Sequence, residues 1–291
     1  MRADLADRLA AAGLDPAYVE HVVRGALDED LAGGVDVTSV ATVPADQHAV
    51  ADLVARADGV VSGLPVAEAA LAAAGAVTVV AAPVCDGASV GRGDVLLTVA
   101  GPARDLLTAE RVALNLLCRL SGVATLTRRW VDAVAGTGAA VRDTRKTTPG
   151  LRALEKYAVR CGGGVNHRMA LSDAAMVKDN HVVAAGGVRA AFEAVRRAFP
   201  DVPVEVEVDS VEQCREAVAA GADLVLLDNM PLADIRACVG LAAGRARLEA
   251  SGGLTLETAR AVAETGVDYL AVGALTHSAP HLDIACDLRE P

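Results

Sequence analysis

The sequence predicts an α/β protein with two domains, the second of them a barrel of parallel strands. From about residue 139 onward short apolar runs alternate with Ala-rich helical stretches, whereas the residues before that follow another pattern. Regular alternation of strand and helix is typical of parallel strands joined by crossovers. About six such units occur without a G-x-G-x-x-G opening, so a barrel is favoured over an open dinucleotide-binding sheet.

Six candidate strands follow one another in this part of the chain, separated by helical stretches such as SVEQCREAVAA and TLETARAVAETG. In barrels the carboxyl ends of the strands line the face that carries the active site. The candidate strands are AAVRD (139–143), AAMVK (174–178), VEVEVD (204–209), LVLLD (224–228), ARLEA (246–250) and YLAV (269–272).

Polar residues recur at the carboxyl ends of these strands. Because side chains alternate between the two faces of a strand, VEVEVD places Glu205, Glu207 and Asp209 on one face and three valines on the other. One acidic face would fit a half-solvated strand, but the other strands end in a similar way. Their polar or glycine endings are Asp143, Lys178, Asp228, Glu249 with the following Ser251–Gly253, and Gly273.

The N-terminal third resembles a carrier-type β-sandwich. The stretch VVAAPVCDGASVGRGDVLLTVAG (79–101) predicts turns at Asp86-Gly87 and Gly93-Asp94. A lipoyl or biotinyl carrier is excluded, since no lysine precedes residue 146. A long helix should then bridge to the barrel, with a boundary near residue 113. We expect residues 1–113 plus 279–291 to form the N-terminal domain and 114–278 the barrel domain.

Composition indicates a compact globular protein, with 53% apolar and 22% charged residues in 291. No apolar run is long enough to span a bilayer, and the N-terminus MRADLADRLAAAGL reads as a surface helix rather than a signal peptide. Six scattered cysteines without a C-x-x-C pair favour reduced thiols and a cytoplasmic location. A net charge of -11 and only six aromatic residues argue against nucleic-acid binding.

Residues 142–168 form a basic segment, with seven Lys or Arg against two acids. Thr148 and Pro149 predict a helix start and Gly162 its end. Arg152, Lys156 and Arg160 recur every fourth residue, which is typical of a solvated helix face. In contrast, Arg145 and Lys146 sit between a strand end and a helix N-terminus, where backbone N–H groups favour anions.

Further candidate residues lie at the end of the basic segment and beyond it. His167 and Arg168 lie in a Gly-rich loop, and Lys178 ends a strand; a lone His is more often structural, and Lys178 would also suit a Schiff-base enzyme. The acids Glu207, Asp228 and Glu249 are of the type that binds Mg²⁺. Glycines after the late strands would let backbone amides approach phosphates. We therefore expect two polyanionic ligands, one a phosphate ester with magnesium. The two candidate phosphate loops are Ser251-Gly252-Gly253 and Val272-Gly273-Ala274.

Several motifs in order resemble the quinolinate phosphoribosyltransferase family, a type II phosphoribosyltransferase family. They cover nearly the whole chain and include ALDEDLAGGVDVTS, LLTAERVALNLLCRLSG, RDTRKTTPGLRALEKYAVRCGGGVNHR, VKDNH, VEVEVDS, LLDN, EASGGL and VGALTHS. The resemblance implies an N-terminal α/β sandwich domain and an incomplete, TIM-like α/β barrel. It also implies a homodimer with sites between subunits. The implied reaction joins quinolinate to phosphoribosyl pyrophosphate with Mg²⁺, giving nicotinate mononucleotide, pyrophosphate and CO₂.

The resemblance also assigns roles to matching residues. Arg145, His167, Arg168 and Lys178 should surround the two carboxylates of quinolinate, with Thr144 in the same substrate site and Arg111 reaching in from the other subunit. Lys146, Glu207 and Asp228 should hold the phosphoribosyl donor, the two acids through its metal. Ser251, Gly252 and Gly253 with Val272, Gly273 and Ala274 should take the phosphates. Lys146, Lys178, Glu207 and Asp228 are the catalytic candidates, and Lys178 or His167 could supply a proton.

Three alternatives stay open at this level. A paralogue of the same fold would use nicotinate or a molybdenum-linked substrate, although five cations favour a dicarboxylate. A Schiff-base aldolase would use Lys178 as its nucleophile. A non-catalytic phosphosugar sensor would leave the acids and bases superfluous.

Overall fold

The computed structural model describes residues 1–290, which form two compact units. The first contains Met1–Arg128, Thr147–Gly163 and the segment from Thr276 to the end of the described chain; the second contains Arg129–Lys146 and Gly164–Leu275. The expected boundary near residue 113 falls inside one unbroken helix, and Pro291, the last residue of the expected N-terminal domain, lies outside the described residues. Within residues 1–290, no helix combines the length and apolar composition needed to cross a bilayer.

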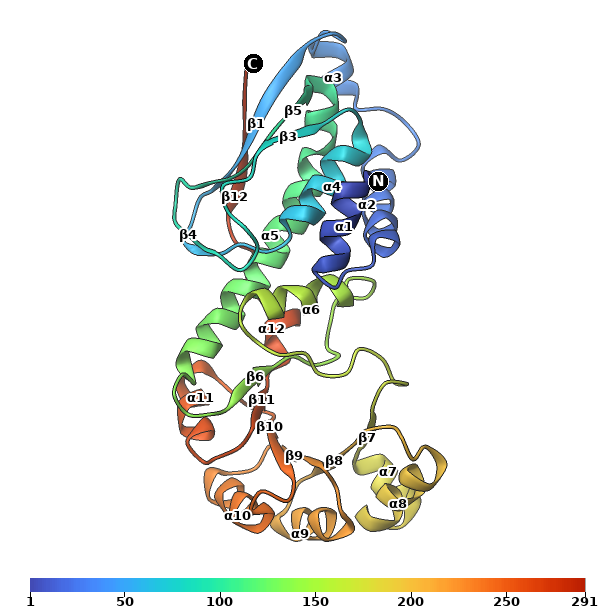
Figure 1. The fold of residues 1–291 in the computed structure, drawn as a ribbon, viewed down its shortest axis with the longest axis vertical. Helices are drawn as coiled ribbons and strands as arrows, with labels where there is room; N and C mark the ends of the chain where they lie inside the picture. The colour runs from blue at the N-terminus through green and yellow to red at the C-terminus, as the bar shows by residue number, and fades with distance from the viewer. Residues whose placement is uncertain (291) are drawn as a thin grey trace. The chain divides into compact units, whose positions relative to one another are not determined.

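The first unit is an antiparallel sheet with helices (Figure 1). The sheet has the order β12-β1-β5-β3, and β2 pairs with β4. Its helices are α1 (Ala3–Ala11), α2 (Pro16–Leu31), α3 (Val37–Thr42), α4 (Leu64–Ala74), α5 (Ala103–Ala133), which continues into the second unit, and α6 (Arg152–Cys161). Its strands are β1 (His48–Ala55), β2 (Gly59–Val60), β3 (Thr78–Ala81), β4 (Ser89–Val90), β5 (Val95–Pro102) and β12 (Ile284–Arg289).

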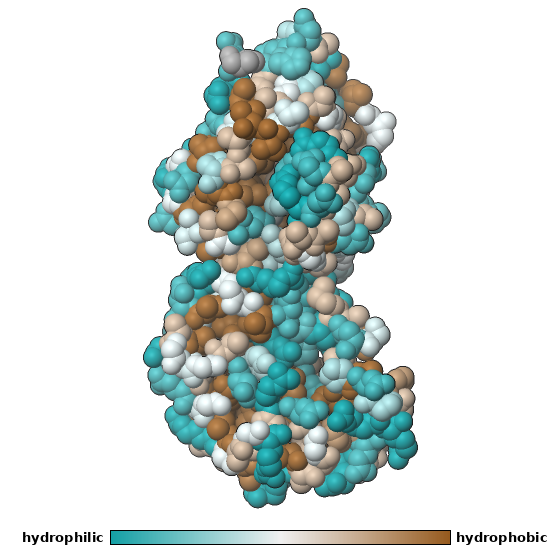
Figure 2. Space-filling model, viewed as in Figure 1, coloured by the Kyte–Doolittle hydropathy of each residue, from teal (hydrophilic) through white to brown (hydrophobic). Residues whose placement is uncertain are grey.

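The turns expected in this unit are present, and Gly87 and Gly93 adopt positive φ angles of 89° and 97°. The neighbouring Asp86 accepts hydrogen bonds from the N–H groups of Gly63 and Leu64, at 2.8 and 3.0 Å, where α4 begins. The motif is therefore structural here. Figure 2 shows hydrophobic residues gathered over the sheet of this unit, on whose strands Val80, Val95 and Leu288 are exposed.

Helix α6 corrects two expectations. It begins at Arg152, and Thr148 instead donates its backbone N–H and its hydroxyl to the Glu155 carboxylate at 3.0 and 2.7 Å. The expected solvated stripe is also wrong, because Lys156 is 0% exposed. Residues 154–159 of the helix are all buried, so packing encloses the face that carries this lysine. Arg160 is exposed, as expected.

The second unit is built on a six-stranded parallel sheet with the order β6-β11-β10-β9-β8-β7. Figure 1 shows α8 to α11 following one another along one side of it. The predicted α/β architecture and the positions of the six expected strands are confirmed. Strands β6 and β7 are the two edge strands of the sheet, which fits an incomplete barrel. The elements are β6 (Ala140–Arg142), β7 (Ala175–Val177), α7 (Asp179–Ala185), α8 (Val188–Ala198), β8 (Val204–Val208), α9 (Val211–Ala220), β9 (Leu224–Asp228), α10 (Leu232–Ala242), β10 (Arg247–Ser251), α11 (Leu256–Ala263), β11 (Tyr269–Ala271) and α12 (Ala274–His277), whose last two residues belong to the first unit.

Strand register shows which side chains share the inner face of this sheet. Glu207 pairs with Leu226, which also pairs with Glu249, and Asp228 pairs with Ser251. Laterally paired residues point to the same side of a sheet, so these polar side chains share one face. The other face meets the helices with buried apolar residues: Val204, Val206, Val208, Val225, Leu227, Leu248, Ala250 and Leu270.

Candidate active site

The carboxyl ends of the parallel strands bring most of the expected site residues to one edge of the second unit. Lys178 directly follows β7, Glu207 is near the end of β8, and Asp228 and Ser251 end β9 and β10. Parallel strands aligned in register present their ends together. This edge therefore combines lysine, carboxylate and hydroxyl groups from four neighbouring strands.

Lys178 and Glu207 form an ion pair at this edge. The Lys178 Nζ lies 2.6 Å from Glu207 Oε2, with the two side chains 47% and 16% exposed. The backbone N–H of Lys178 donates to His181 Nδ1 at 2.9 Å, which fixes the start of α7. A cation that binds Glu207 would compete with Lys178 and release its ammonium group to an anion.

Arg145 and Arg168 are close enough for their charges to interact. Burial and then the charge of Arg145 lower the pKa of the Arg168 guanidinium. Arg168 Nη1 donates to the Ala174 carbonyl at 2.7 Å, whereas Arg145 Nε is buried and lacks a hydrogen-bond partner among residues 1–290. Two neighbouring guanidinium groups with an unused buried donor are suited to a ligand with more than one negative charge.

His167 is buried and held by the protein through both ring nitrogens. Its Nδ1 lies 2.6 Å from the backbone nitrogen of Arg168, and an N–H can only donate, so Nδ1 is the acceptor. The ring proton is then on Nε2, which donates to Glu205 Oε2 at 2.6 Å. The His167 backbone N–H donates to Asp143 Oδ1 at 2.8 Å. These contacts fix the tautomer and the orientation of the ring.

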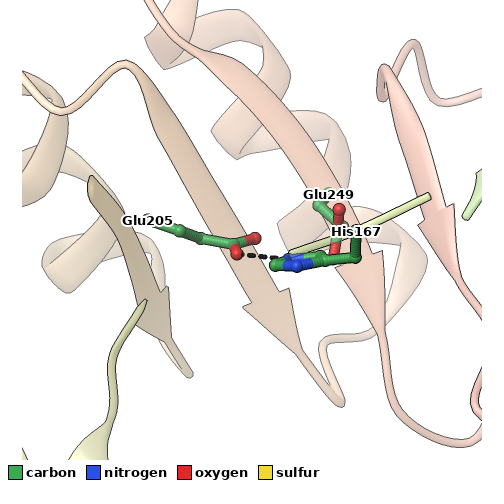
Figure 3. Close-up of side chains that lie close together, drawn as sticks. All are labelled: His167, Glu205 and Glu249. Carbon is green, nitrogen blue, oxygen red and sulfur yellow. Dashed lines mark hydrogen bonds and ion pairs between the residues drawn. The ribbon is translucent and has the colours of Figure 1, made fainter. Parts of the chain in front are cut away.

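Glu249 also lies close to the His167 ring (Figure 3), with its Oε1 atom 3.7 Å from His167 Nε2. Its Oε2 accepts from Arg142 Nη1 at 2.7 Å, and the Arg142 guanidinium stacks over the Tyr269 ring, 4.6 Å from the centroid. Burial and then the charge of Glu205 raise the pKa of Glu249 to about 7, against the opposing effects of His167 and Arg142. When Glu249 carries its proton, Glu205 and Arg142 remain as one balanced pair of charges.

His167, Glu205 and Glu249 together have ligand atoms within 4.8 Å of one another, as a metal site requires. Two observations argue against a metal there. The Nε2 lone pair is not available, because Nε2 carries the proton donated to Glu205, and the Arg142 cation already lies against Glu249. The oxygen-only pair Glu207 and Asp228, which the sequence predicted, is the better match for Mg²⁺.

Of the two expected phosphate loops, Ser251-Gly252-Gly253 has its glycines in the left-handed region of backbone conformation. Gly252 and Gly253 adopt φ angles of 84° and 61°, and a Cβ at Gly252 would overlap the side-chain amide of Asn229. Asn229, itself at a φ of 54°, donates its backbone N–H to the Ser251 carbonyl at 2.9 Å. Residues 272–274 lead from β11 into α12, and the Val272 N–H donates to the Arg142 carbonyl at 2.9 Å.

The remaining expected residues lie on two different segments. Thr144 Oγ1 accepts a hydrogen bond from the Lys146 N–H at 3.0 Å, so these residues form a turn after β6, and Lys146 is exposed. Arg111 belongs to α5 in the first unit, where its side chain is 66% exposed and its guanidinium is 4.0 Å from the Glu110 carboxylate.

Sequence reasoning assigned no role to Arg142, Glu205 or Asn229, and considered Glu249 only as a metal ligand. The alternation in VEVEVD did place Glu205 on the face of Glu207. Glu205 lies 38 positions from His167 in the chain, so no local pattern could reveal their hydrogen bond.

Comparisons with known proteins match both parts of the chain. The model for the C-terminal domain of quinolinate phosphoribosyl transferase matches residues 123–287, and the N-terminal domain model matches residues 36–121. A nicotinate-nucleotide pyrophosphorylase (carboxylating) of Mycobacterium leprae is 54% identical over 271 residues, which cover 91% of this chain and 95% of that protein. A quinolinate phosphoribosyltransferase (decarboxylating) of Nicotiana glauca is 41% identical, covering 93% and 82%. The structure of NadC from Streptococcus pyogenes has a TM-score of 0.91 and 42% identity, covering 95% and 98%.

Proposed function

The chain belongs to the quinolinate phosphoribosyltransferase family, and from this premise we propose how its own side chains carry out the reaction. The enzyme transfers the phosphoribosyl group of phosphoribosyl pyrophosphate to quinolinate with decarboxylation. The products are nicotinate mononucleotide, pyrophosphate and CO₂, in the de novo synthesis of NAD.

The observation that carries the substrate assignment is the pair of neighbouring guanidinium groups. Burial and then the charge of Arg145 lower the Arg168 pKa, and Arg145 Nε is a buried donor with no hydrogen-bond partner in residues 1–290. Two carboxylates on adjacent ring carbons would relieve this repulsion and use bidentate donors. Lys178 adds a further cation at the strand ends, and Thr144 and His167 are assigned to the same pocket by family resemblance.

We assign the phosphoribosyl donor to a second group of residues, made of two acids, one lysine and two glycine-containing loops. Glu207 and Asp228 offer oxygen ligands for Mg²⁺, which when bound supplies positive charge against the pyrophosphate. Lys146 is exposed after β6, where a point charge suits a phosphate. The loops Ser251-Gly252-Gly253 and Val272-Gly273-Ala274 would take the phosphates through backbone N–H groups, which the left-handed glycines of the first loop support.

The chemistry follows from the charges of these groups. The pyridine nitrogen forms a bond to the anomeric carbon as the bond to pyrophosphate breaks, and Lys146 stabilises the charge on the leaving group. The ring nitrogen is then positive, so the adjacent carbon–carboxylate bond can break and leave its electron pair beside that charge. A proton replaces CO₂ on this carbon. We propose Lys178 as its source, because its ammonium is accessible at the strand ends whereas the His167 Nε2 proton faces Glu205.

A homodimer is proposed as the working assembly, with Arg111 entering the partner's site. The exposed Arg111 side chain and the exposed hydrophobic residues on the first unit's sheet support this (Figure 2). Mixing Arg111→Ala with a variant defective in Lys178 should restore part of the activity, since one kind of site in the mixed dimer is intact. A cytoplasmic location and the lack of a nucleic-acid partner stay proposals that rest on composition.

The rival activities make different demands on Lys178. A Schiff-base aldolase needs the Lys178 amine as a nucleophile for its substrate, but here the Nζ atom is paired with Glu207 at 2.6 Å. Borohydride would trap a covalent adduct in that case and none in ours. A paralogue that used nicotinate would bind one carboxylate and release no CO₂.

The direct test supplies quinolinate labelled in the 2-carboxyl group together with phosphoribosyl pyrophosphate and Mg²⁺. Labelled CO₂ should appear only when all three are present. Failure of well-folded protein to release it would overturn the assignment. The proton-donor role is tested with Lys178→Ala: it is lost if the variant binds quinolinate more weakly but keeps the wild-type rate at saturation.

A further inference from the structure

Glu205 and Glu249 are buried acids that none of the assignments above uses. Their side chains are 3% and 0% exposed, and they approach the His167 ring from two strands (Figure 3). One oxygen of each, Oε1 in both residues, lacks a hydrogen-bond partner among residues 1–290. Burying a carboxylate is unfavourable unless it has a hydrogen-bond or charge partner, so the partner of each acid indicates what the acid does.

Two hydrogen bonds connect Glu205 to Arg168 through the His167 ring. Glu205 accepts the Nε2 proton at 2.6 Å, and with the proton there Nδ1 is free to accept the backbone N–H of Arg168, also at 2.6 Å. If the ring carried its proton on Nδ1, two donors would face each other and the Arg168 backbone would have to move. The carboxylate of Glu205 thus selects the tautomer on which the placement of Arg168 depends.

The hydrogen-bond partner of Glu249 is on β6, which holds the other side of the loop that carries His167 and Arg168. Glu249 accepts from Arg142 Nη1 at 2.7 Å, at the end of β6. The next residue, Asp143, accepts the backbone N–H of His167 at 2.8 Å and the Asn166 side-chain amide at 2.5 Å. A parallel bridge between Arg142 and Val165 joins the loop to β6. The loop is therefore held from β6, β8 and β10.

We propose that Glu205 and Glu249 are positioning residues for the dicarboxylate pocket. Glu205 acts through the His167 ring and Glu249 through Arg142, and together they hold the loop that carries Arg168 beside Arg145. This inference rests on the proposed function, in which those two arginines bind the carboxylates of quinolinate. Neither acid has to touch the substrate.

The test compares substitutions at Glu205 that differ in one property each. Glu205→Gln keeps an oxygen that can accept the Nε2 proton, Glu205→Leu removes it, and Glu205→Asp keeps the charge but shortens its reach. The matched control is Glu264→Gln at the residue that follows α11, an exposed glutamate paired with Arg260 at 2.9 Å. For each variant kcat and the KM of each substrate are measured, with thermal unfolding as the check of folding.

Glu205→Leu and Glu205→Asp should raise KM for quinolinate roughly tenfold or more, because an unpaired buried donor frees the ring and with it Arg168. Glu205→Gln should stay within about threefold of wild type, because its amide oxygen accepts the same proton. KM for phosphoribosyl pyrophosphate should not change in any of them. Glu249→Gln should behave like Glu205→Gln, because its oxygen still accepts from Arg142.

An unchanged KM for quinolinate in Glu205→Asp, or an equal rise for both substrates, would overturn the positioning role. Should Glu205→Leu fail to fold, Glu205→Asp and Glu205→Gln still decide between the outcomes. Failure of the proposed function gives a different result, since the wild type itself would then release no CO₂ from quinolinate.

Discussion

Glu249→Gln should make the stability of the protein less dependent on pH. Burial and the charge of Glu205 raise the pKa of this carboxyl to about 7. A folded-state pKa above the unfolded value means that the folded state holds the proton more tightly, so the stabilisation is present at low pH and is lost as pH rises through the folded value. Glutamine imitates the protonated acid at every pH and keeps an acceptor for Arg142.

The magnitude follows from the two pKa values. Between an ordinary glutamate near 4.5 and a value near 7, the wild type should lose ~3 kcal/mol of unfolding free energy from this group. The loss should lie mostly between about pH 5 and pH 8, where the variant has no corresponding group. The difference in stability between variant and wild type should therefore grow by ~2–3 kcal/mol in favour of the variant over this range.

Urea unfolding at a series of pH values measures this difference. The absolute stability of the variant is not needed, because only the change of the difference with pH reports on the carboxyl. Glu264→Gln, an exposed glutamate, serves as the control and should give a nearly constant difference. A constant difference for Glu249→Gln as well would show that Glu249 is ionised across the range and would refute the reasoning.

Replacing Gly252 by alanine should lower stability by ~1–2 kcal/mol and raise KM for the phosphoribosyl donor, because its φ is 84° and a Cβ would overlap Asn229; an unchanged unfolding curve would contradict this. Lys146→Ala should lower kcat/KM by ~100-fold, whereas Lys146→Arg, which keeps the charge, should lose less, and equal rates for the two would remove the charge argument. Chelation of Mg²⁺ should abolish activity, and Glu207→Gln should raise the Mg²⁺ concentration that restores it; persistent activity in chelator would rule out the metal role of this acid.

Much of the second unit could be predicted because its signals are local. Strand β9 has the predicted bounds of LVLLD, and β8 agrees with VEVEVD to one residue. Both predictions rest on the pattern of apolar residues at consecutive positions of the sequence. Burial of a charged side chain is different. Lys156 matched the spacing of a solvated face, yet its side chain is fully buried in the folded chain.

The same limit applies to the site. Strand-end positions led to Lys178, Glu207 and Asp228, because the carboxyl ends of parallel strands meet whatever their sequence. Which of these side chains contact one another could not be predicted, as the ion pair between Lys178 and Glu207 shows. Hydrogen bonds of the His167 ring depend on strands brought together only in the folded chain.

The division of the chain has a consequence for its synthesis on the ribosome. The first unit contains the beginning of the chain and also the segment from Thr276 onward, whose strand β12 pairs with β1 from Ala55↔Ile284 to Val50↔Arg289. While later residues are still inside the exit tunnel, β1 is left with an open edge. Nascent chains usually complete their N-terminal domain first. In this protein the first unit is completed only after the residues of the second unit have been made, so chains that stop before Thr276 should expose that edge to aggregation.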